Sequence, residues 1–196
     1  MRAEELAGSL KNLSTTLYNA LWSAFTSIVR QEWEKAHETA SRMLAEAEQH
    51  SMALWSVFGR HLLGCALVGL DQPEGALVEL ERGREEAASL EHRILQPMTM
   101  SFEARALAAL GRHDDGLKRL KQALRFVEET QERWWEPDIH RVTGLMMLEQ
   151  GRSPEACDAA FRRAVEAATA QGSKLLALRA EDTWSATTRR KSASAR

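Results

Sequence analysis

The stretch of residues 101–124, SFEARALAALGRHDDGLKRLKQAL, contains the pattern that predicts the fold. Apolar residues recur at helical spacing after the dipeptide Gly111-Arg112, as Leu117, Leu120 and Leu124 show. A glycine is the residue expected just beyond the end of a helix. The stretch therefore predicts a helix, a short turn at Gly111 and a second helix.

The same unit recurs along the chain with a period of about 40 residues. The dipeptides Gly151-Arg152 and Asp71-Gln72 align with Gly111-Arg112, and Pro73 and Pro154 fall where a following helix would begin. Two columns of small residues align as well: Ala24, Gly64, Ala104 and Gly144 in the first helix, and Ala36, Ala76, Gly116 and Ala156 in the second. Small residues at fixed positions allow two helix backbones to approach closely. A generic helical bundle would also have apolar helix faces, but it gives no reason for equally spaced small residues.

The third and fourth units resemble the tetratricopeptide (TPR) pattern. The third supplies Ala104, Gly111, Gly116, Leu120 and Ala123, and the fourth supplies Gly144, Gly151, Phe161 and Ala164 with one residue inserted. The unit is longer than the 34 residues of a TPR, and it lacks an aromatic residue early in its first helix. The resemblance implies an all-α, TPR-like right-handed solenoid of antiparallel helix pairs.

We expect a single repeat domain over residues 1–187. Its parts are the trailing half of a second helix (1–13), four repeats (14–50, 51–91, 92–132 and 133–172), a terminal first helix (173–187) and a disordered tail (188–196). An unpaired repeat would leave an apolar face in water. These ends suggest the C-terminal portion of a longer protein or a gene remnant, and self-association through the terminal repeats is a further expectation.

A second resemblance involves residues 132–151, ERWWEPDIHRVTGLMMLEQG, and residues 155–180, EACDAAFRRAVEAATAQGSKLLALRA. These segments are similar to the C-terminal TPR-like region of large bacterial signalling ATPases, including those linked to adenylate or guanylate cyclase domains and LuxR-type regulators. In that family the nucleotide chemistry lies in domains N-terminal to the repeats. The resemblance implies a non-catalytic regulatory scaffold whose partners are the ATPase or cyclase domains of the same polypeptide. The alternative is a free-standing adaptor that binds a peptide or helix.

Composition and charge exclude several other classes. The formal charge is −2, with 28% charged residues of both signs, so neither nucleic acid nor an anionic membrane is an expected partner. The first residues, MRAEELAGSLKNLS, lack the apolar stretch of a signal peptide. Cys65 and Cys157 are far apart and form no metal spacing. We therefore expect a cytoplasmic protein without a cofactor.

Signals for catalysis are weak. Neither the G-x-x-x-x-G-K-[ST] loop nor the G-x-G-x-x-G turn occurs, so no phosphate-binding loop is predicted. His113, Asp114 and Asp115 are adjacent at a predicted helix start, where acidic side chains favour the helix dipole without a metal. Triads assemble in space, so the sequence leaves a Ser-His-Asp arrangement open. The prediction is a protein that is not an enzyme.

The aromatic residues are interpreted mainly as packing residues. Trp134 and Trp135 precede the predicted fourth repeat's first helix, where indoles either form a stacking platform or wedge between repeats; we favour the wedge. Trp22, Trp33 and Trp55 are interpreted in the same way.

In TPR arrays the first helices line a concave groove, and alignment to that pattern gives a candidate protein-binding groove. Its two arginines would meet carboxylates of a peptide or helix, beside apolar anchors at the other end. The residues are Tyr18, Leu21, Phe25, Phe58, His61, Met98, Ser101, Arg105, Asp138 and Arg141.

Overall fold

The computed structural model describes residues 2–194 and the side chains of residues 13–187. This part of the chain is helical without a strand, which confirms the all-α prediction. It divides into two compact units, Met1–Arg93 and Ile94–Arg196. Unit 1 contains α1 (Arg2–Arg30), α2 (Trp33–Gln49), α3 (Ala53–Gly69) and α4 (Pro73–Ser89). Unit 2 contains α5 (Gln96–Ala109), α6 (His113–Thr130), α7 (Glu136–Glu149), α8 (Pro154–Ala170) and α9 (Lys174–Ser194).

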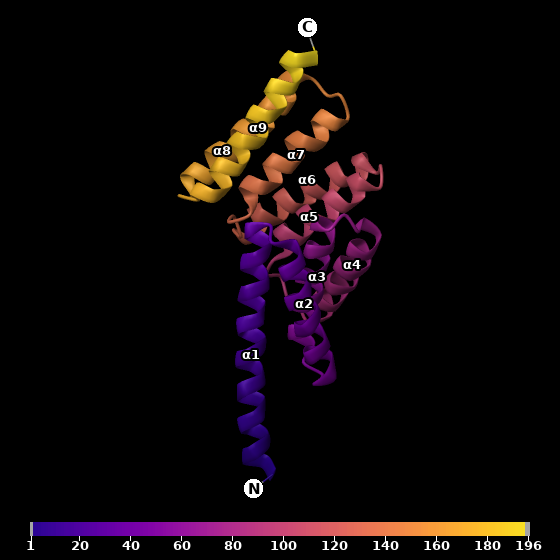
Figure 1. The fold of residues 1–196 in the computed structure, drawn as a ribbon, viewed down its shortest axis with the longest axis vertical. Helices are drawn as coiled ribbons and strands as arrows, with labels where there is room; N and C mark the ends of the chain where they lie inside the picture. The colour runs from indigo at the N-terminus through magenta and orange to yellow at the C-terminus, as the bar shows by residue number, and fades with distance from the viewer. Residues whose placement is uncertain (1, 195–196) are drawn as a thin grey trace. The chain divides into compact units, whose positions relative to one another are not determined.

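Each unit is built from packed helix pairs (Figure 1). In unit 1, α1 packs on α2 and α3 packs on α4, while α3 also contacts both helices of the preceding pair. In unit 2, α5 packs on α6 and α7 on α8, while α7 contacts both α5 and α6 and α9 contacts both α7 and α8. The predicted pairs are thus the pairs observed.

The helix ends recur about every twenty residues, which is half the length of the 40-residue unit. Within two residues of the end of each of the first eight helices, one residue adopts a left-handed backbone conformation, at positions twenty residues apart except for a final step of twenty-one: Gln31, Ser51, Asp71, Glu91, Gly111, Gln131, Gly151 and Gly172. Leu95, directly before α5, has a positive φ as well. At most of these ends the next amide donates to a carbonyl five residues earlier, as from Arg112 to Leu107 at 2.8 Å. This bond satisfies a carbonyl that the helix end leaves free. The predicted turns at Asp71, Gly111 and Gly151 are confirmed.

The small residues lie where the two helices of a pair cross. A β-carbon on Gly64 would lie 2.5 Å from Cγ of Leu80, and one on Gly116 would lie 2.9 Å from the carbonyl oxygen of Ala104. In the last pair the buried small residue of α8 is Cys157, whereas Ala156 is only half-buried. The predicted alignment at Ala156 is therefore wrong by one position, because the extra residue lies before α8, which begins at Pro154.

The chain ends differ from the expected boundaries. α1 is one continuous helix, so no break separates residues 2–13 from the first repeat. α9 continues to Ser194, beyond the expected helix end at 187, and residues 195–196 of the predicted tail lie outside the described residues. Neither glycine nor proline occurs between residues 9 and 30 or within α9, so nothing in the sequence stops either helix. The single domain over 1–187 stays a prediction, and each unit is described by itself.

Candidate protein-binding surface

The ten residues of the predicted groove fall in both units. Six of them have buried side chains and belong to the cores of their units: Phe58, His61, Met98, Ser101, Asp138 and Arg141. Tyr18 is exposed, and the remaining three are partly exposed: Leu21, Phe25 and Arg105. The predicted groove residues that remain accessible therefore lie mainly on α1.

An aromatic face on α1 is formed by Tyr18, Trp22 and Phe25. The Tyr18 and Trp22 rings meet edge to face at 6.1 Å, and the Trp22 and Phe25 rings at 5.5 Å. Tyr18 is 53% exposed and Trp22 49%, and every other phenylalanine, tyrosine or tryptophan side chain in the described part of the chain is buried or half-buried. The interpretation of Trp22 as a packing residue is therefore wrong.

The helical period of α1 explains this face. Leu17, Ala24 and Ile28 are buried on one side of the helix. Tyr18 and Trp22 are four residues apart on another side, which places their rings one above the other. Trp22 was missed as a site residue, although its spacing of four from Tyr18 and three from Phe25 was a usable signal.

A groove lies between α1 and α2 beside the aromatic face. Its volume is about 480 Å³. Buried Leu17 and Met43 contribute to its floor with the half-buried Ala20. Polar side chains complete the lining: Thr16, Asn19, Ser23, Thr39, Arg42 and Glu46. Asn19 precedes Trp22 by three residues, so the groove and the aromatic face adjoin on α1.

A buried arginine links three helices in the same unit. Arg60 of α3 is 4% exposed, and its Nε and Nη1 donate to Glu86 and Glu79 of α4, each at 2.9 Å. Its Nη2 donates to Glu48 of α2. Burial works to lower the pKa of Arg60, but the bonds to Glu79 and the charge of Glu86 outweigh it and leave the pKa above its usual value. Because every partner is a carboxylate within the unit, Arg60 acts as a structural crosslink.

His61 lies next to Arg60 in the core, where its ring is fully buried against Gly83 of α4. Burial, with a smaller effect from His92, lowers the pKa of His61 to about 4, although a backbone hydrogen bond with Gly83 acts to raise it. A neutral, fully buried imidazole is a packing group here and reaches no surface.

In unit 2 the predicted Asp138 and Arg141 pair with each other. Nε and Nη2 of Arg141 both lie 2.8 Å from the same oxygen of Asp138. Burial lowers the pKa of Arg179 of α9, a residue that the sequence analysis missed. The nearby charge of Asp138 acts to raise this pKa and that of Arg141 to lower it, and the pKa stays below its usual value. The guanidinium of Arg105 lies over the Phe102 ring, 4.7 Å from its centre.

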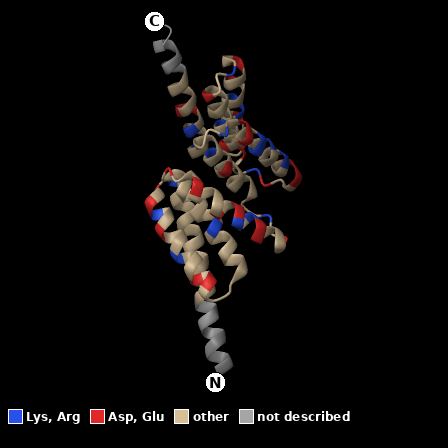
Figure 2. Ribbon diagram, turned by 90° about the vertical axis from the view of Figure 1, so that its right-hand side faces the viewer, with Lys and Arg blue, Asp and Glu red and all other residues tan. Residues whose placement is uncertain are grey.

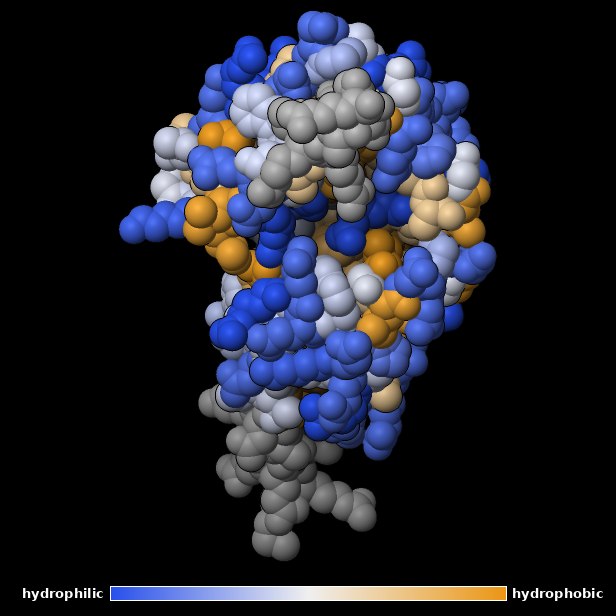
Figure 3. Space-filling view, turned by 45° about the horizontal axis from the view of Figure 1, so that its top comes forward, coloured by the Kyte–Doolittle hydropathy of each residue, from blue (hydrophilic) through white to orange (hydrophobic). Residues whose placement is uncertain are grey.

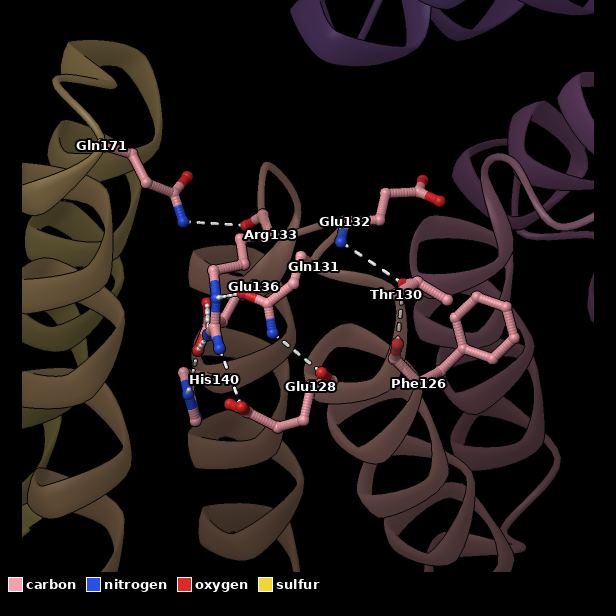
Figure 4. A network of polar contacts seen from close by, with 9 residues as sticks. All are labelled: Phe126, Glu128, Thr130, Gln131, Glu132, Arg133, Glu136, His140 and Gln171. Atoms are coloured by element: carbon pink, nitrogen blue, oxygen red, sulfur yellow. Dashed lines mark hydrogen bonds and ion pairs between the residues drawn. The ribbon is translucent and has the colours of Figure 1, made fainter.

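The connection between α6 and α7 is fixed by polar contacts (Figure 4). Arg133 donates to Glu128 at 2.8 Å and to Glu136 at 3.0 Å, and its carbonyl accepts from Gln171 at 2.8 Å. The side chain of Glu132 accepts bonds from the Leu95 amide and the Trp134 indole, each at 3.0 Å. These contacts tie α6, α7 and α8 together at one end.

Trp135 bears out the wedge interpretation. Its side chain is 1% exposed and stacks on Phe102 of α5, with ring centres 6.1 Å apart. Trp134 is half-buried beside it, with ring centres 5.2 Å apart. The pair joins neighbouring repeats and leaves no open stacking platform.

The other polar signals do not form a second site. Asp115 pairs with Arg112 and Lys118, whereas Asp114 accepts from Gln150. Among the described residues no group of three His, Cys, Asp or Glu side chains could hold a metal ion. Basic and acidic residues are interspersed within each unit (Figure 2). On the face drawn in Figure 3, hydrophobic side chains form separate patches among hydrophilic ones.

Comparisons with known proteins agree with the fold. A crystal structure of a TPR-like protein from Chlorobium tepidum superposes with a TM-score of 0.61 at 20% identity, covering 71% of this chain and 97% of that one. The fold is therefore TPR-like. The uncharacterized protein R02095 of Rhizobium meliloti (strain 1021) is 26% identical over 159 residues, which are 80% of this chain but only 15% of that protein. No family model matches the chain. No helix in the described residues has the length and apolar character needed to cross a membrane.

Proposed function

We propose that this chain is a non-catalytic protein–protein interaction module that binds its partner through the aromatic face of α1. The exposed pair Tyr18 and Trp22 carries the proposal, because the other aromatic side chains of the described chain are buried or half-buried. Tyrosine and tryptophan are enriched at the centres of protein interfaces, where one rigid ring buries a large area. The buried Arg60 and the Asp138–Arg141 pair bind groups within their own units, so they offer no comparable surface to a partner.

The module belongs, in this proposal, to a larger cytoplasmic signalling ATPase or cyclase whose catalytic domains it binds or regulates. The resemblance of residues 132–180 to such proteins supports this, as does the much longer Rhizobium meliloti relative. An immunoblot of native host lysate tests it directly. A band far above 22.0 kDa is the expected result, and a band at 22.0 kDa contradicts the larger polypeptide.

A free-standing adaptor is the second candidate, and the same aromatic face favours it, since an open apolar surface can bind a separate protein. Both candidates require the face. Replacing Trp22 by serine should weaken binding at least about thirtyfold in either, whereas Val78→Ser is a matched control, because Val78 is 54% exposed on α4. An unchanged complex with Trp22→Ser would contradict both.

A further inference from the structure

Neighbouring helix pairs stack through one face of the first helix of each pair. On α3 this face contains Gly59, Leu62 and Gly69, which are spaced so that they lie on one side of the helix. A β-carbon on Gly59 would lie 2.9 Å from Cβ of Leu44 of α2, and one on Gly69 would overlap the ring of Trp33 of α2. Leu62, between the two glycines, is fully buried. α2 therefore covers this side of α3, which is termed the stacking face.

The same contact recurs in unit 2 in the same register. Adding 80 residues to Trp33 and Gly69 gives His113 of α6 and Glu149 of α7, and Nδ1 of His113 lies 3.6 Å from a carboxylate oxygen of Glu149. Both contacts join the start of a second helix to the end of the next first helix, so the two helices run antiparallel. Within each unit, the second helix of one pair thus covers the first helix of the next pair in a repeated arrangement.

α1 carries the stacking face without a cover. Its residues at this face are Asn19, Trp22 and Thr26, and all three are exposed. The residues 40 and 120 positions further along, on α3 and α7, are buried: Gly59, Leu62 and Ala66, and Ile139, Val142 and Met146. Because Ile139 is buried, a side chain at the position of Asn19 is compatible with a covering helix. Trp22 therefore occupies a position that is buried on α3 and α7, where a second helix precedes.

The composition of this face favours a cover as well. The terminal repeat of a solenoid normally needs a polar outer face, because its stacking surface meets water. Trp22 is 49% exposed on this face, and the neighbouring Tyr18 is 53% exposed. Among the described helices α1 contacts α2 and α3, and neither covers these two rings. The face thus has the composition of an interface.

We propose that a helix of the partner packs antiparallel on the stacking face of α1, in the register that α2 adopts on α3, and so extends the stack by one helix. The inference rests on the proposed function and names the partner's chemistry. It continues an interface that the chain already makes within each unit, and amphipathic helices commonly bind to the surfaces of other helices. The stretch from Asn19 to Thr26 spans roughly 10 Å, so about two turns of the partner helix meet it.

α8 and α9 show how a second helix accommodates an indole. Trp184 of α9 stacks on Phe161 of α8 with ring centres 6.5 Å apart, and its indole nitrogen donates to Asp158 of α8 at 2.9 Å. Asp158 and Phe161 are three residues apart and therefore lie on one face of α8. A partner helix that carries an apolar side chain three or four residues after an acidic or amide side chain can hold Trp22 in the same way.

Photo-crosslinking in host cells tests the proposal on the protein as it is naturally made. p-Benzoylphenylalanine is placed at Asn19, at Thr26 and, as an exposed control, at Val78 of α4. Mass spectrometry maps the partner residues to which each position attaches. We expect positions 19 and 26 to attach to one segment, at sites about seven residues apart and in reverse order, because antiparallel helices rise equally per residue in opposite directions. Position 78 should not attach to that segment.

A peptide with the sequence of the attached segment should gain helical circular dichroism when it binds. Thr26→Arg puts a guanidinium at a position that is buried on α3 and α7, and burying a charge without a partner is costly. We therefore expect Thr26→Arg to weaken binding of the peptide at least tenfold and Val78→Arg to leave it unchanged. If Thr26→Arg does not fold, Asn19→Arg replaces it, since Asn19 is exposed on the same face.

Four results overturn the proposal: no crosslink from positions 19 and 26, crosslinked sites in parallel order, a segment that is extended or belongs to a second copy of this chain, and unchanged affinity of a folded arginine variant. If Trp22→Ser still weakens binding, the proposed function stands and the packed helix alone is refuted. If binding by Trp22→Ser is also unchanged, both are refuted.

Discussion

Gly83 of α4 leaves the space that the imidazole of His61 occupies: a β-carbon on Gly83 would lie 2.6 Å from Cδ2 and 3.0 Å from Nε2 of the ring. The same atom would lie 3.2 Å from Cβ of Arg60. Two neighbouring residues of α3, the buried histidine and the buried arginine, therefore depend on one glycine in the facing helix.

Replacing Gly83 by alanine should destabilise unit 1. The added methyl group must displace the ring, and overpacking of this kind costs about 1–3 kcal/mol. Gly75→Ala in the same helix is the control, since a β-carbon there would meet only Leu67 Cδ1 at 3.8 Å. That control should gain about 0.5–1 kcal/mol, because glycine is a poor helix former. Urea unfolding followed by circular dichroism measures both, and equal midpoints for the two variants would argue against the close packing.

Stability should fall as the solution becomes acidic, in the range where the buried histidine gains a proton. The pKa of His61 is lowered to about 4 in the folded state, against 6.5 for an unperturbed histidine, so the unfolded chain binds the proton more readily. The contribution of neutral His61 to the free energy of unfolding is fully present above pH 6.5. It is lost progressively as the pH falls towards 4, by roughly 3 kcal/mol in total. The lowered pKa of His92 and of His140 acts in the same direction. His61→Leu should flatten the pH dependence of the unfolding free energy, whereas His50→Leu, at an exposed position, should preserve it.

Removing the guanidinium of Arg60 should cost about 2–3 kcal/mol. The change leaves Glu48, Glu79 and Glu86 without their shared cation, and the loss is smaller than for a fully buried pair because all three carboxylates are at least partly exposed. Arg60→Lys should recover only part of the loss, since a single ammonium group cannot reproduce the three-way geometry. Chemical denaturation of these variants beside Arg42→Ala, an exposed arginine, checks the expectation. A midpoint for Arg60→Ala equal to that of Arg42→Ala would refute the crosslink.

Replacing a left-handed residue at a helix end by glycine should raise the stability of the protein. Glu91 has φ of 52° after α4, where an L residue is strained by about 1 kcal/mol. Glu91→Gly should therefore raise stability by up to ~1 kcal/mol, and Gly111→Ala, at φ of 75°, should lower it by a similar amount. Thermal unfolding of the two variants should shift in opposite directions, and shifts of the same sign would contradict this account of the helix ends.

Much of the fold was predictable because its signals are local. The glycines at 111 and 151 and the prolines at 73 and 154 identify turns directly, and the spacing of small residues identifies the helix pairs. The left-handed residues at Gln31, Ser51, Glu91 and Gln131 were not predictable, because glutamine, serine and glutamate also occur within helices and do not mark a helix end. The single-residue shift at Cys157 depended on whether the inserted residue preceded or followed the start of α8, which periodicity does not determine.

The candidate binding surface was less predictable than the fold. Positions 58, 61, 98 and 101 were assigned to a groove by alignment, yet neighbouring helices cover them. The exposure of a side chain depends on how closely other helices approach it. The sequence pattern of a single helix does not determine that distance. Tyr18 is accessible because the contacts of α1 with other helices are with α2 and α3, and the same arrangement exposes Trp22, which the sequence analysis interpreted as a packing residue.

Binding through the aromatic face of α1 is tested by the affinity of the partner for three proteins: the wild type, Trp22→Ser and Val78→Ser. Calorimetric titration gives the dissociation constants, and circular dichroism confirms that each variant is folded. Because truncating an interface tryptophan typically costs 2 kcal/mol or more, we expect Trp22→Ser to bind at least about thirtyfold more weakly and Val78→Ser to bind like the wild type. Equal affinity of a folded Trp22→Ser variant would contradict the claim that the aromatic face of α1 is the binding surface.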